Sequence, residues 1–369
     1  PIHRGFDETL GFSLISRYLP AGDPNAMNCE LGDMLDKFLW ANVRYEMKKD
    51  TGPHFEPEGY LTDYLAKEAG EAIRVNKDSP FFMYLAFTSV HTPMQALKSD
   101  YDKLSHTSLS HCSKVYAAML MALDRGVGTV LDSLKEHDLS DNTIVIFTSD
   151  NGAPEYILER EVNAPYRGWK ASFFEGGIKV PFFMQWPKMI RPSSHFKPLI
   201  SHIDILPTVL AAAGHGDSIK HDIDGVNLLP FLKGADILSG NSELIPTATG
   251  TGTDDGEEKD ELSLVHDTLY WRSGHYSAFR KGKYKLQYST KLPNKLWLYD
   301  MQKDPTEQYN LAYVPSFKAL LKDMRASMAE EVSKHRESLW PSLSESPVLI
   351  DKLENEGYEE GDEYIYWAN

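Results

Sequence analysis

The sequence is poor in several features that mark familiar classes of protein. It contains only two cysteines, Cys29 and Cys112, so it offers neither a framework of disulfides nor a cysteine-rich zinc cluster. No apolar run is long enough to cross a bilayer, and no transmembrane segment is predicted. No Asn-X-Ser/Thr site is present, which disfavours a glycosylated animal secretory protein. The two cysteines would pair in an exported protein, but their spacing alone leaves this open.

Positive charge is also scarce. The chain has 38 Lys and Arg residues against 54 Asp and Glu residues, a formal net charge of −16. A chain of this charge repels nucleic acids and anionic membranes, so we predict neither as a partner. An anionic substrate would therefore require a local positive pocket, built against the field of the whole protein.

The remaining composition is that of a folded protein. The 369 residues suggest one large domain or two domains. The hydrophobic fraction is 41% and the charged fraction 25%, which suits a globular protein with a sizeable core.

The hydrophobic pattern alternates between two periods. Residues 61–76 and 114–136 place apolar side chains at steps of three and four, which predicts two amphipathic helices. Continuous apolar runs at 81–87, 143–147 and 180–187 predict buried strands. Strands that are apolar throughout and alternate with helices are typical of a largely parallel or mixed sheet covered on both faces. We therefore predict an α/β fold.

The pattern changes twice along the chain. The α/β pattern covers residues 1–235 and is followed by an acidic, Gly- and Thr-rich stretch at 236–262, which predicts a flexible connection. Residues 263–369 begin with alternating aromatic and polar residues around Arg280-Lys281-Gly282-Lys283, a hairpin pattern, and continue with a helical pattern. We predict a small C-terminal α+β subdomain with an antiparallel sheet.

Polar side chains follow two of the predicted strands. Asp150 and Asn151 come just after the strand at 143–147, and His91 follows the strand at 81–87. Ligands of such sheets bind outside the carboxyl ends of the strands, so we expect the three residues at one edge. Carboxylate and amide oxygens suit Ca²⁺ or Mg²⁺, although Asp-Asn-Gly is also a common turn. A His at this edge is suited to bind an anionic oxygen or protonate a leaving group, although a structural His is the more common case.

Two cations follow in a Gly-containing loop. Arg167 and Lys170 lie within four residues of each other, which suggests an anion pocket, with solvated loop charges as the alternative. A metal, a His and a Lys around one point suit metal-assisted hydrolysis of an anionic ester. These residues do not separate sulfate from phosphate esters.

Seven segments together carry a resemblance to a known family. In chain order they read RGFDETLGF, PFFMYLAFTSVHTP, YAAMLMALDRGVGTVLDSLKEHDLSDNTIVIFTSDNGAP, RGWKASFFEGGIKVPFFMQWP, HIDILPTVLAAAG, DIDGVNLLPFLKG and LWLYDMQKDPTEQYNLA. This set resembles the type I sulfatases, the arylsulfatase-like members of the alkaline phosphatase superfamily. The resemblance implies an alkaline phosphatase-like fold and a sulfuric ester hydrolase that depends on one Ca²⁺ ion.

The resemblance also implies roles for single residues. Asp150 and Asn151 are similar to two of the calcium ligands of the family. His91 resembles the pocket histidine near the leaving oxygen, and Lys170 resembles the lysine that binds the sulfate group, so both are predicted as catalytic. Arg167 has no firm counterpart in the family and is assigned to substrate binding as a hypothesis.

The family's nucleophile is not among these residues. It is a formylglycine that a maturation enzyme makes from the Cys or Ser of a Cys/Ser-X-Pro-X-Arg motif, and neither Cys29 nor Cys112 fits that motif. The remaining metal ligands of the family are missing as well. We therefore expect an N-terminally truncated fragment that is inactive alone, from an exported protein that cleaves sulfate esters of a carbohydrate. A phosphodiesterase or phosphonate monoester hydrolase, and a non-catalytic glycan-binding scaffold, remain as alternatives.

Overall fold

The structure is a computed structural model whose described part has several gaps. It describes residues 1–11, 16–31, 34–157, 159–219, 221–233, 243–244, 265–291, 295–336, 339–340, 342 and 345–368. The chain forms two compact units. The first is Pro1–Thr143 with Tyr156–Glu159, and the second is Ile144–Glu155 with Arg160–Asn369. The predicted connection at 236–262 lies outside the described residues apart from 243–244.

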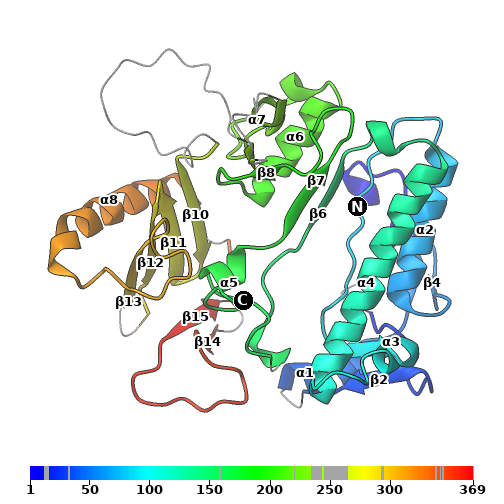
Figure 1. Ribbon diagram of the computed structural model, residues 1–369, viewed down its shortest axis with the longest axis horizontal. Helices are drawn as coiled ribbons and strands as arrows, with labels where there is room; N and C mark the ends of the chain where they lie inside the picture. Colours follow the sequence, from blue (N-terminus) through cyan, green and yellow to red (C-terminus); the bar gives the residue numbers. More distant parts are fainter. Residues whose placement is uncertain are drawn as a thin grey trace. The chain divides into compact units, whose positions relative to one another are not determined.

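The first unit is built around two long helices that run alongside each other (Figure 1). Its helices are α1 (Met34–Asn42), α2 (Leu61–Asn76), α3 (Lys98–Asp102) and α4 (His111–Glu136), with 3-10 turns at Ile2–Arg4 and Ser140–Asn142. Its strands are β1 (Leu10–Gly11), β2 (Ala26–Cys29), β3 (Met47–Lys49), β4 (His54–Phe55) and β5 (Met94–Leu97). Both amphipathic helices predicted from the sequence are confirmed.

Small residues let α2 and α4 pack closely. A Cβ atom placed on Gly126 of α4 would lie 3.4 Å from the Cβ of Ala66 on α2. Further along, the hydroxyl of Ser133 donates to the carbonyl of Gly70 at 3.1 Å. The first turn of α4 is capped by Ser110, whose Oγ accepts from the N–H of Ser113.

The two cysteines form a disulfide in this unit. Cys29 at the end of β2 is bonded to Cys112 in the first turn of α4, across 83 residues of chain. The pairing that the sequence left open is therefore present. It links the β2–β5 pair to the helical layer.

One predicted strand is wrong. Residues 81–87 have no regular secondary structure, and their exposure alternates, with Phe82 and Tyr84 exposed at 61% and 75%. They nevertheless form no strand, because no described segment supplies backbone partners for a ladder. The apolar run alone does not make a strand, because a strand also needs a neighbouring segment for its backbone hydrogen bonds.

The second unit contains the strands that flank the candidate site. Its strands are β6 (Val145–Thr148), β7 (Phe182–Gln185), β8 (His195–Phe196), β9 (Glu243–Leu244), β10 (Thr268–Ser273), β11 (Tyr276–Lys281), β12 (Tyr284–Ser289), β13 (Lys295–Asp300), β14 (Glu345–Leu349) and β15 (Tyr364–Ala368). Its helices are α5 (Glu175–Ile178), α6 (Ile205–Ala212), α7 (Leu229–Lys233) and α8 (Lys318–Lys334), with 3-10 turns at His202–Asp204, Gly216–Ser218 and Pro315–Phe317. A further 3-10 turn, Glu155–Ile157, spans the boundary between the units.

The pairing of these strands refines the predicted fold class. A fold of mixed helix and sheet with a C-terminal antiparallel sheet is confirmed. β6 and β7 pair antiparallel, with Val145 opposite Gln185 and Thr148 opposite Phe182. Among the described strands, parallel pairing occurs between β8 and β9.

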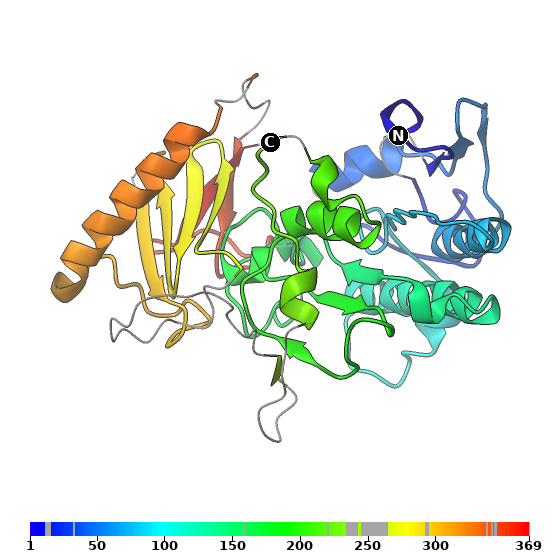
Figure 2. The ribbon, with the colours of Figure 1, turned by 90° about the horizontal axis from the view of Figure 1, so that it is seen from above.

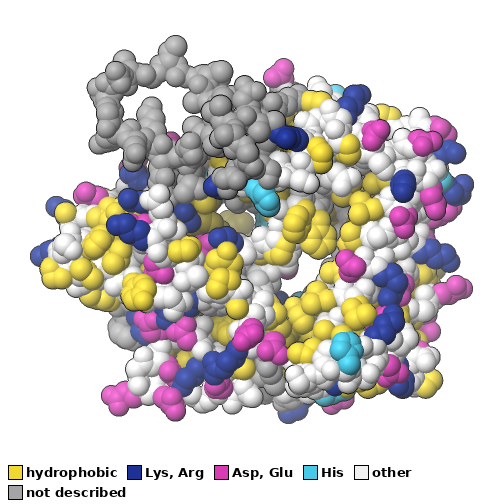
Figure 3. Space-filling view, viewed as in Figure 1, with side chains coloured by type: hydrophobic (Ala, Val, Ile, Leu, Met, Phe, Trp, Pro, Cys, Tyr) yellow, Lys and Arg dark blue, Asp and Glu magenta, His cyan; other side chains and the backbone are white. Residues whose placement is uncertain are grey.

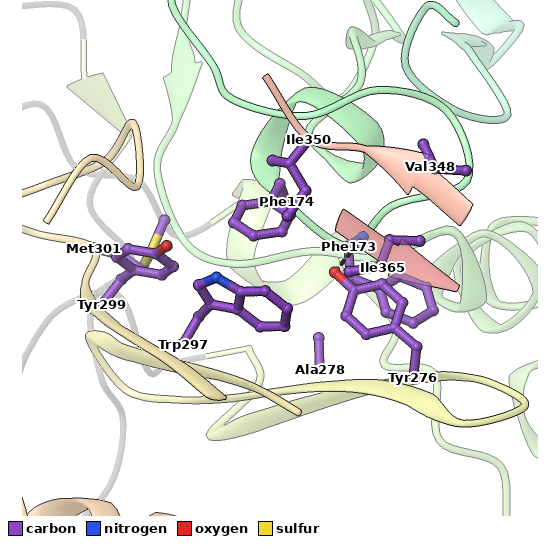
Figure 4. Packing of buried hydrophobic residues seen from close by; sticks show 10 residues of the cluster. All are labelled: Phe173, Phe174, Tyr276, Ala278, Trp297, Tyr299, Met301, Val348, Ile350 and Ile365. Carbon is purple, nitrogen blue, oxygen red and sulfur yellow. Dashed lines mark hydrogen bonds between the residues drawn. The ribbon is translucent and has the colours of Figure 1, made fainter. Parts of the chain in front are cut away.

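The C-terminal sheet is a meander of β10, β11, β12 and β13 with a helix on one face and a hairpin on the other (Figure 2). Side chains on a strand alternate between the two faces. One face packs on α8 through Phe279, Leu286, Leu298, Met324 and Met328. The other face belongs to a cluster that includes Phe173, Phe174, Tyr276, Ala278, Trp297, Tyr299, Met301, Val348, Ile350 and Ile365 (Figure 4).

Two residues of the candidate anion loop take part in that second cluster. Phe173 stacks on Tyr276 with ring centroids 4.7 Å apart, and Phe174 meets Trp297 edge-on at 5.7 Å. Both phenylalanines are almost fully buried. The loop between β6 and β7 is therefore anchored in the core of the C-terminal sheet.

Candidate functional site

β6 ends at Thr148 and leads directly into the acid–amide pair. Asp150 is exposed and Asn151 is half-buried. The N–H of Asn151 donates to Oδ1 of Asp150 at 2.9 Å, and the Nδ2 group of Asn151 donates to the carbonyl of Gly152 at 2.9 Å. With its amide nitrogen engaged in this way, the Asn151 side chain presents its oxygen as an acceptor.

Glycines allow this turn to lie directly on the loop that follows. The N–H of Gly152 donates to the carbonyl of Gly177 at 2.9 Å. A Cβ atom at Gly152 would lie 1.7 Å from the carbonyl oxygen of Gly176, and one at Gly176 would lie 2.2 Å from that of Gly168. Only glycine fits these approaches, so the sequence Asp-Asn-Gly serves more than a local turn.

The backbone of Lys170 is hydrogen-bonded to the segment that follows the Asp150-Asn151-Gly152 turn. Its N–H donates to the carbonyl of Ala153 at 3.0 Å. The side chain of Asn163 exchanges two hydrogen bonds with the backbone of Ala153, at 2.9 and 2.8 Å, and reaches the carbonyl of Gly168 at 3.2 Å. Burial lowers the pKa of the Lys170 ammonium, while the negative charges of Asp150 and Glu155 oppose this shift. The structure therefore brings Lys170 into the field of the acid–amide turn.

Arg167 is engaged with protein partners. Its side chain is only 11% exposed and forms ion pairs with Asp351 and Glu363. Its Nη1 group also donates to the hydroxyl of Tyr299 at 3.1 Å. Burial would lower the pKa of the guanidinium, but its acidic partners outweigh this and the pKa is raised. These contacts suit an anchoring role better than the substrate contact hypothesised from the sequence.

A buried ionic cluster fixes the start of α5. Nζ of Lys285, on β12 and fully buried, lies 2.8 Å from Oε1 of Glu175 and 3.0 Å from Oε1 of Glu307. Oε2 of Glu307 accepts the N–H of Glu175 at 2.5 Å, and the amide of Gln287 donates to Oε1 of Glu307 at 2.9 Å. Burial raises the pKa of Glu307, whereas Lys285 outweighs the same effect at Glu175 and lowers its pKa.

Sequence reasoning missed Lys285 and Glu307. The only signal was that Lys285 and Gln287 share one face of β12, the face opposite to Leu286 and α8. A buried charge in the middle of an aromatic strand needs partners, but the sequence does not say which acids supply them.

His91 belongs to the first unit. Its N–H donates to the carbonyl of Thr88 at 2.8 Å, and its Nδ1 lies 2.8 Å from the carbonyl oxygen of Thr92. The hydroxyl of Tyr18 donates to the carbonyls of both His91 and Thr88. The turn that carries His91 is thus well fixed, and the bond at Nδ1 orients its ring.

The described residues supply some, but not all, of the ligands that a metal ion would need. Asp150 and Asn151 offer hard oxygen donors of the type that Ca²⁺ prefers. No group of three or more His, Cys, Asp or Glu side chains suited to a metal ion occurs in the described ranges. Since Ca²⁺ takes six to eight oxygen ligands, the pair fits one part of a coordination shell. Nor does any described helix have the length and apolar character of a membrane span.

Comparison with known proteins gives a consistent result. The family model described as Sulfatase matches residues 3–215. The chain is 35% identical over 180 residues to the uncharacterized sulfatase YdeN of Escherichia coli (strain K12), covering 48% of this chain and 31% of that protein. It is 26% identical over 371 residues to human N-acetylgalactosamine-6-sulfatase, covering 93% of this chain and 64% of that protein.

A solved structure extends this similarity to the fold. The crystal structure of Ps i-CgsB superimposes with a TM-score of 0.69 at 27% sequence identity, over 92% of this chain and 69% of that one. The chain thus spans only part of the length of its relatives. The matched region covers 31% of YdeN and 31% of the steryl-sulfatase of Rattus norvegicus, and 69% of this structural neighbour.

Proposed function

Because the chain belongs to the sulfatase family, we propose that the whole protein hydrolyses sulfate esters at a site to which this chain contributes Asp150, Asn151, Lys170 and His91. The observation that carries the proposal is the closure of Gly152 onto Gly177. It holds the acid–amide turn and the loop of Lys170 together in one piece. Such fixed geometry is what electrostatic stabilisation of a transferring group requires.

Each residue has a distinct task in this proposal. The oxygens of Asp150 and Asn151 are two ligands of a Ca²⁺ ion, which when bound neutralises charge on the sulfate group. The ammonium of Lys170 binds a sulfate oxygen. The ring of His91 contacts the leaving oxygen and supplies its proton. Arg167 we assign to holding the loop rather than to substrate.

The remaining parts are expected in a longer chain. The nucleophile is proposed to be a formylglycine, made by a sulfatase-maturing enzyme from a Cys or Ser upstream of Pro1. The other Ca²⁺ ligands are expected there too. The disulfide between Cys29 and Cys112 supports export of the protein, because disulfides persist in oxidising compartments.

For the substrate we propose a sulfated carbohydrate. One solved structure similar to this chain, at 29% identity and a TM-score of 0.69, is Ps i-CgsB in complex with k-i-k-neocarrahexaose. Another relative is named for sulfated N-acetylgalactosamine. Both names refer to carbohydrates, which supports this class of substrate. Steryl-sulfatases at 35–36% identity are also among the relatives.

The first test measures the affinity of the purified chain for a sulfate ester. The measurement is made by calorimetry, with and without Ca²⁺. We expect Lys170→Met to weaken binding of 4-nitrophenyl sulfate about tenfold, as loss of a charged hydrogen bond implies. Lys188→Met, which removes an exposed lysine of the same unit, should leave binding unchanged. Equal affinity of wild type and Lys170→Met would remove Lys170 from the site, and a preference for the phosphate analogue would favour the phosphoesterase alternative.

The same binding should depend on pH. Lys170 must carry its proton to bind sulfate, and its pKa is lowered from the ordinary value of 10.5. Binding should therefore be lost as the pH rises through this lowered pKa, at a lower pH than an ordinary lysine would give. A titration of affinity against pH measures this directly.

A further inference from the structure

A cavity of about 160 Å³ lies beside the loop of Lys170. One wall is the segment that leads into that lysine and includes Tyr166 and Trp169. The lining also includes Gln308 and, just after β14, Ile350 and Asp351. All of these residues belong to the second unit, so the cavity lies within one compact unit.

The residues that line the cavity are held in place by an ion pair and by close packing against buried side chains. Arg167, which also lines the cavity, is paired with Asp351 and joins the two lining segments. Gly168 has a φ of +85°, and a Cβ atom there would lie 2.6 Å from both Phe174 and Ser172. Ile350 packs with Phe174 in the aromatic cluster (Figure 4). A site built in this way loses little entropy when a ligand binds.

The lining combines flat rings with hydroxyl-binding groups. Tyr166 is half-buried, and the ammonium of Lys179 lies 4.4 Å from its ring centroid, which fixes one face of the ring. The amide of Gln308, exposed, and the guanidinium of Arg160 offer donors, while Asp351 and Gln308 offer acceptors. Polar groups predominate in this lining, which suits a ligand rich in hydroxyl groups.

The charges of the lining are compensated. Arg160 forms an ion pair with Glu356, and Arg167 is paired with Asp351 and Glu363. Figure 3 shows the same mixture over the β14–β15 hairpin, where basic and acidic side chains are interspersed. The cavity therefore lacks the excess positive charge that a second sulfate group would need.

We propose that this cavity is a subsite for one uncharged sugar unit of the glycan whose sulfate group binds at Lys170. This inference rests on the proposed function, which places a sulfated carbohydrate at that lysine. The size of the cavity supports a single ring, since it is well below the roughly 300–1,000 Å³ of sites for larger ligands. The C-terminal subdomain thereby takes part in choosing the polysaccharide, because Gln308, Ile350 and Asp351 all come from it.

The test compares sulfated oligosaccharides with a sulfated monosaccharide. Galactose 6-sulfate and a panel of sulfated hexasaccharides from carrageenan, chondroitin sulfate and heparin are titrated against the 369-residue chain by NMR. We expect at least one hexasaccharide to bind about tenfold more tightly than the monosaccharide, the effect of one well-placed sugar contact of about 1.4 kcal/mol. Tyr166→Ala and Gln308→Ala should each remove most of this advantage and leave monosaccharide binding unchanged.

Matched variants control for loss of structure and for the wrong surface. Tyr313→Ala removes an aromatic ring that is 70% exposed elsewhere in the unit, and Gln302→Ala removes an exposed amide. Both should keep the full advantage. If Tyr166→Ala does not fold, Gln308→Ala still decides, because its side chain is at the surface.

The outcomes separate the subsite from the proposed function. If Lys170→Met weakens all ligands while Tyr166→Ala and Gln308→Ala weaken none, the subsite is refuted and the proposed function stands. If no hexasaccharide and no monosaccharide binds to the wild-type chain, the carbohydrate substrate and the subsite are both refuted.

Discussion

Gly152 shows how a single residue without a side chain determines the geometry of the candidate site. Its missing Cβ leaves room for the carbonyl of Gly176, and its N–H closes onto Gly177. Through these contacts the turn of Asp150 and Asn151 is held against the loop of Lys170. A methyl group here would have to displace backbone, which is rigid on both sides.

We predict that Gly152→Ala destabilises the chain by about 3 kcal/mol, the upper end for overpacking a tight site. The control is Gly128→Ala in the middle of α4, where nothing lies within 4 Å of the added methyl group. That variant should gain about 1 kcal/mol, because alanine is the better helix former. Urea unfolding of both variants measures the difference, and equal stability would contradict the close approach at Gly152.

For single residues, the sequence indicates which side chains belong to the candidate site but not which side chains they contact. The position of Asp150 and Asn151 just after a strand was predicted, because β6 has a clear apolar pattern. The partners of Arg167 were not, since Asp351 and Glu363 lie 184 and 196 residues away. The short spacing between Arg167 and Lys170 suggested an anion pocket. In the structure the Arg167 guanidinium instead forms ion pairs with acidic residues that are distant in sequence.

Among the elements, the link between β2 and α4 has the largest expected effect on stability. The disulfide of Cys29 and Cys112 closes 83 residues of chain, including all of α2 and β5. Closing so long a loop restricts the unfolded chain strongly. It also keeps the N-terminus of the longest helix on the β2–β5 pair.

Replacing both cysteines by serine should cost the first unit roughly 4 kcal/mol of unfolding free energy. Hydrogen exchange, read unit by unit, measures this, with protection lost in α2 and α4 and retained in β10–β13. A reducing agent added to the wild-type chain should reproduce the effect and should change nothing in the serine variant. Unchanged protection in α2 would show that the crosslink is not needed for its stability.

Helices were predicted more reliably than strands for a physical reason. The hydrogen bonds of α2 and α4 lie within each helix, so their apolar periodicity was sufficient. The run at 81–87 has an equally clear pattern, but a strand also needs a neighbour, and the described residues provide none. The hairpin around Gly282 was predicted because its partner strands are adjacent in sequence.

At the scale of the whole chain, the sequence aligns with part of the length of its relatives. The residues predicted from the sequence for metal and sulfate binding fall in the second unit, and His91 falls in the first. The family and the general fold class followed from the order of the motifs, and both are confirmed. The roles of the single residues stay predictions.

We predict that the 369-residue chain has no measurable turnover of an aryl sulfate and binds Ca²⁺ weakly. Two oxygen ligands supply too few contacts for a tight Ca²⁺ site, and no residue here is the proposed nucleophile. Assay with 4-nitrophenyl sulfate and a calcium titration measure both quantities. A longer chain with a Cys- or Ser-X-Pro-X-Arg motif upstream should gain activity, whereas turnover by the present chain would refute the proposed nucleophile.

The two acids that hold Arg167 lie at opposite ends of the connection between β14 and β15. A shortened clone that stops after β14 would lack both acids, because Asp351 and Glu363 follow Leu349. The guanidinium would keep only its hydrogen bonds to the hydroxyl of Tyr299 and the carbonyl of Glu307 among these contacts. Trimming the last twenty residues would therefore remove both acidic partners of Arg167, while Phe173 and Phe174 still anchor the loop of Lys170 on the C-terminal sheet. For handling and crystallisation, an intact C-terminal hairpin preserves the ion pairs that neutralise the buried guanidinium.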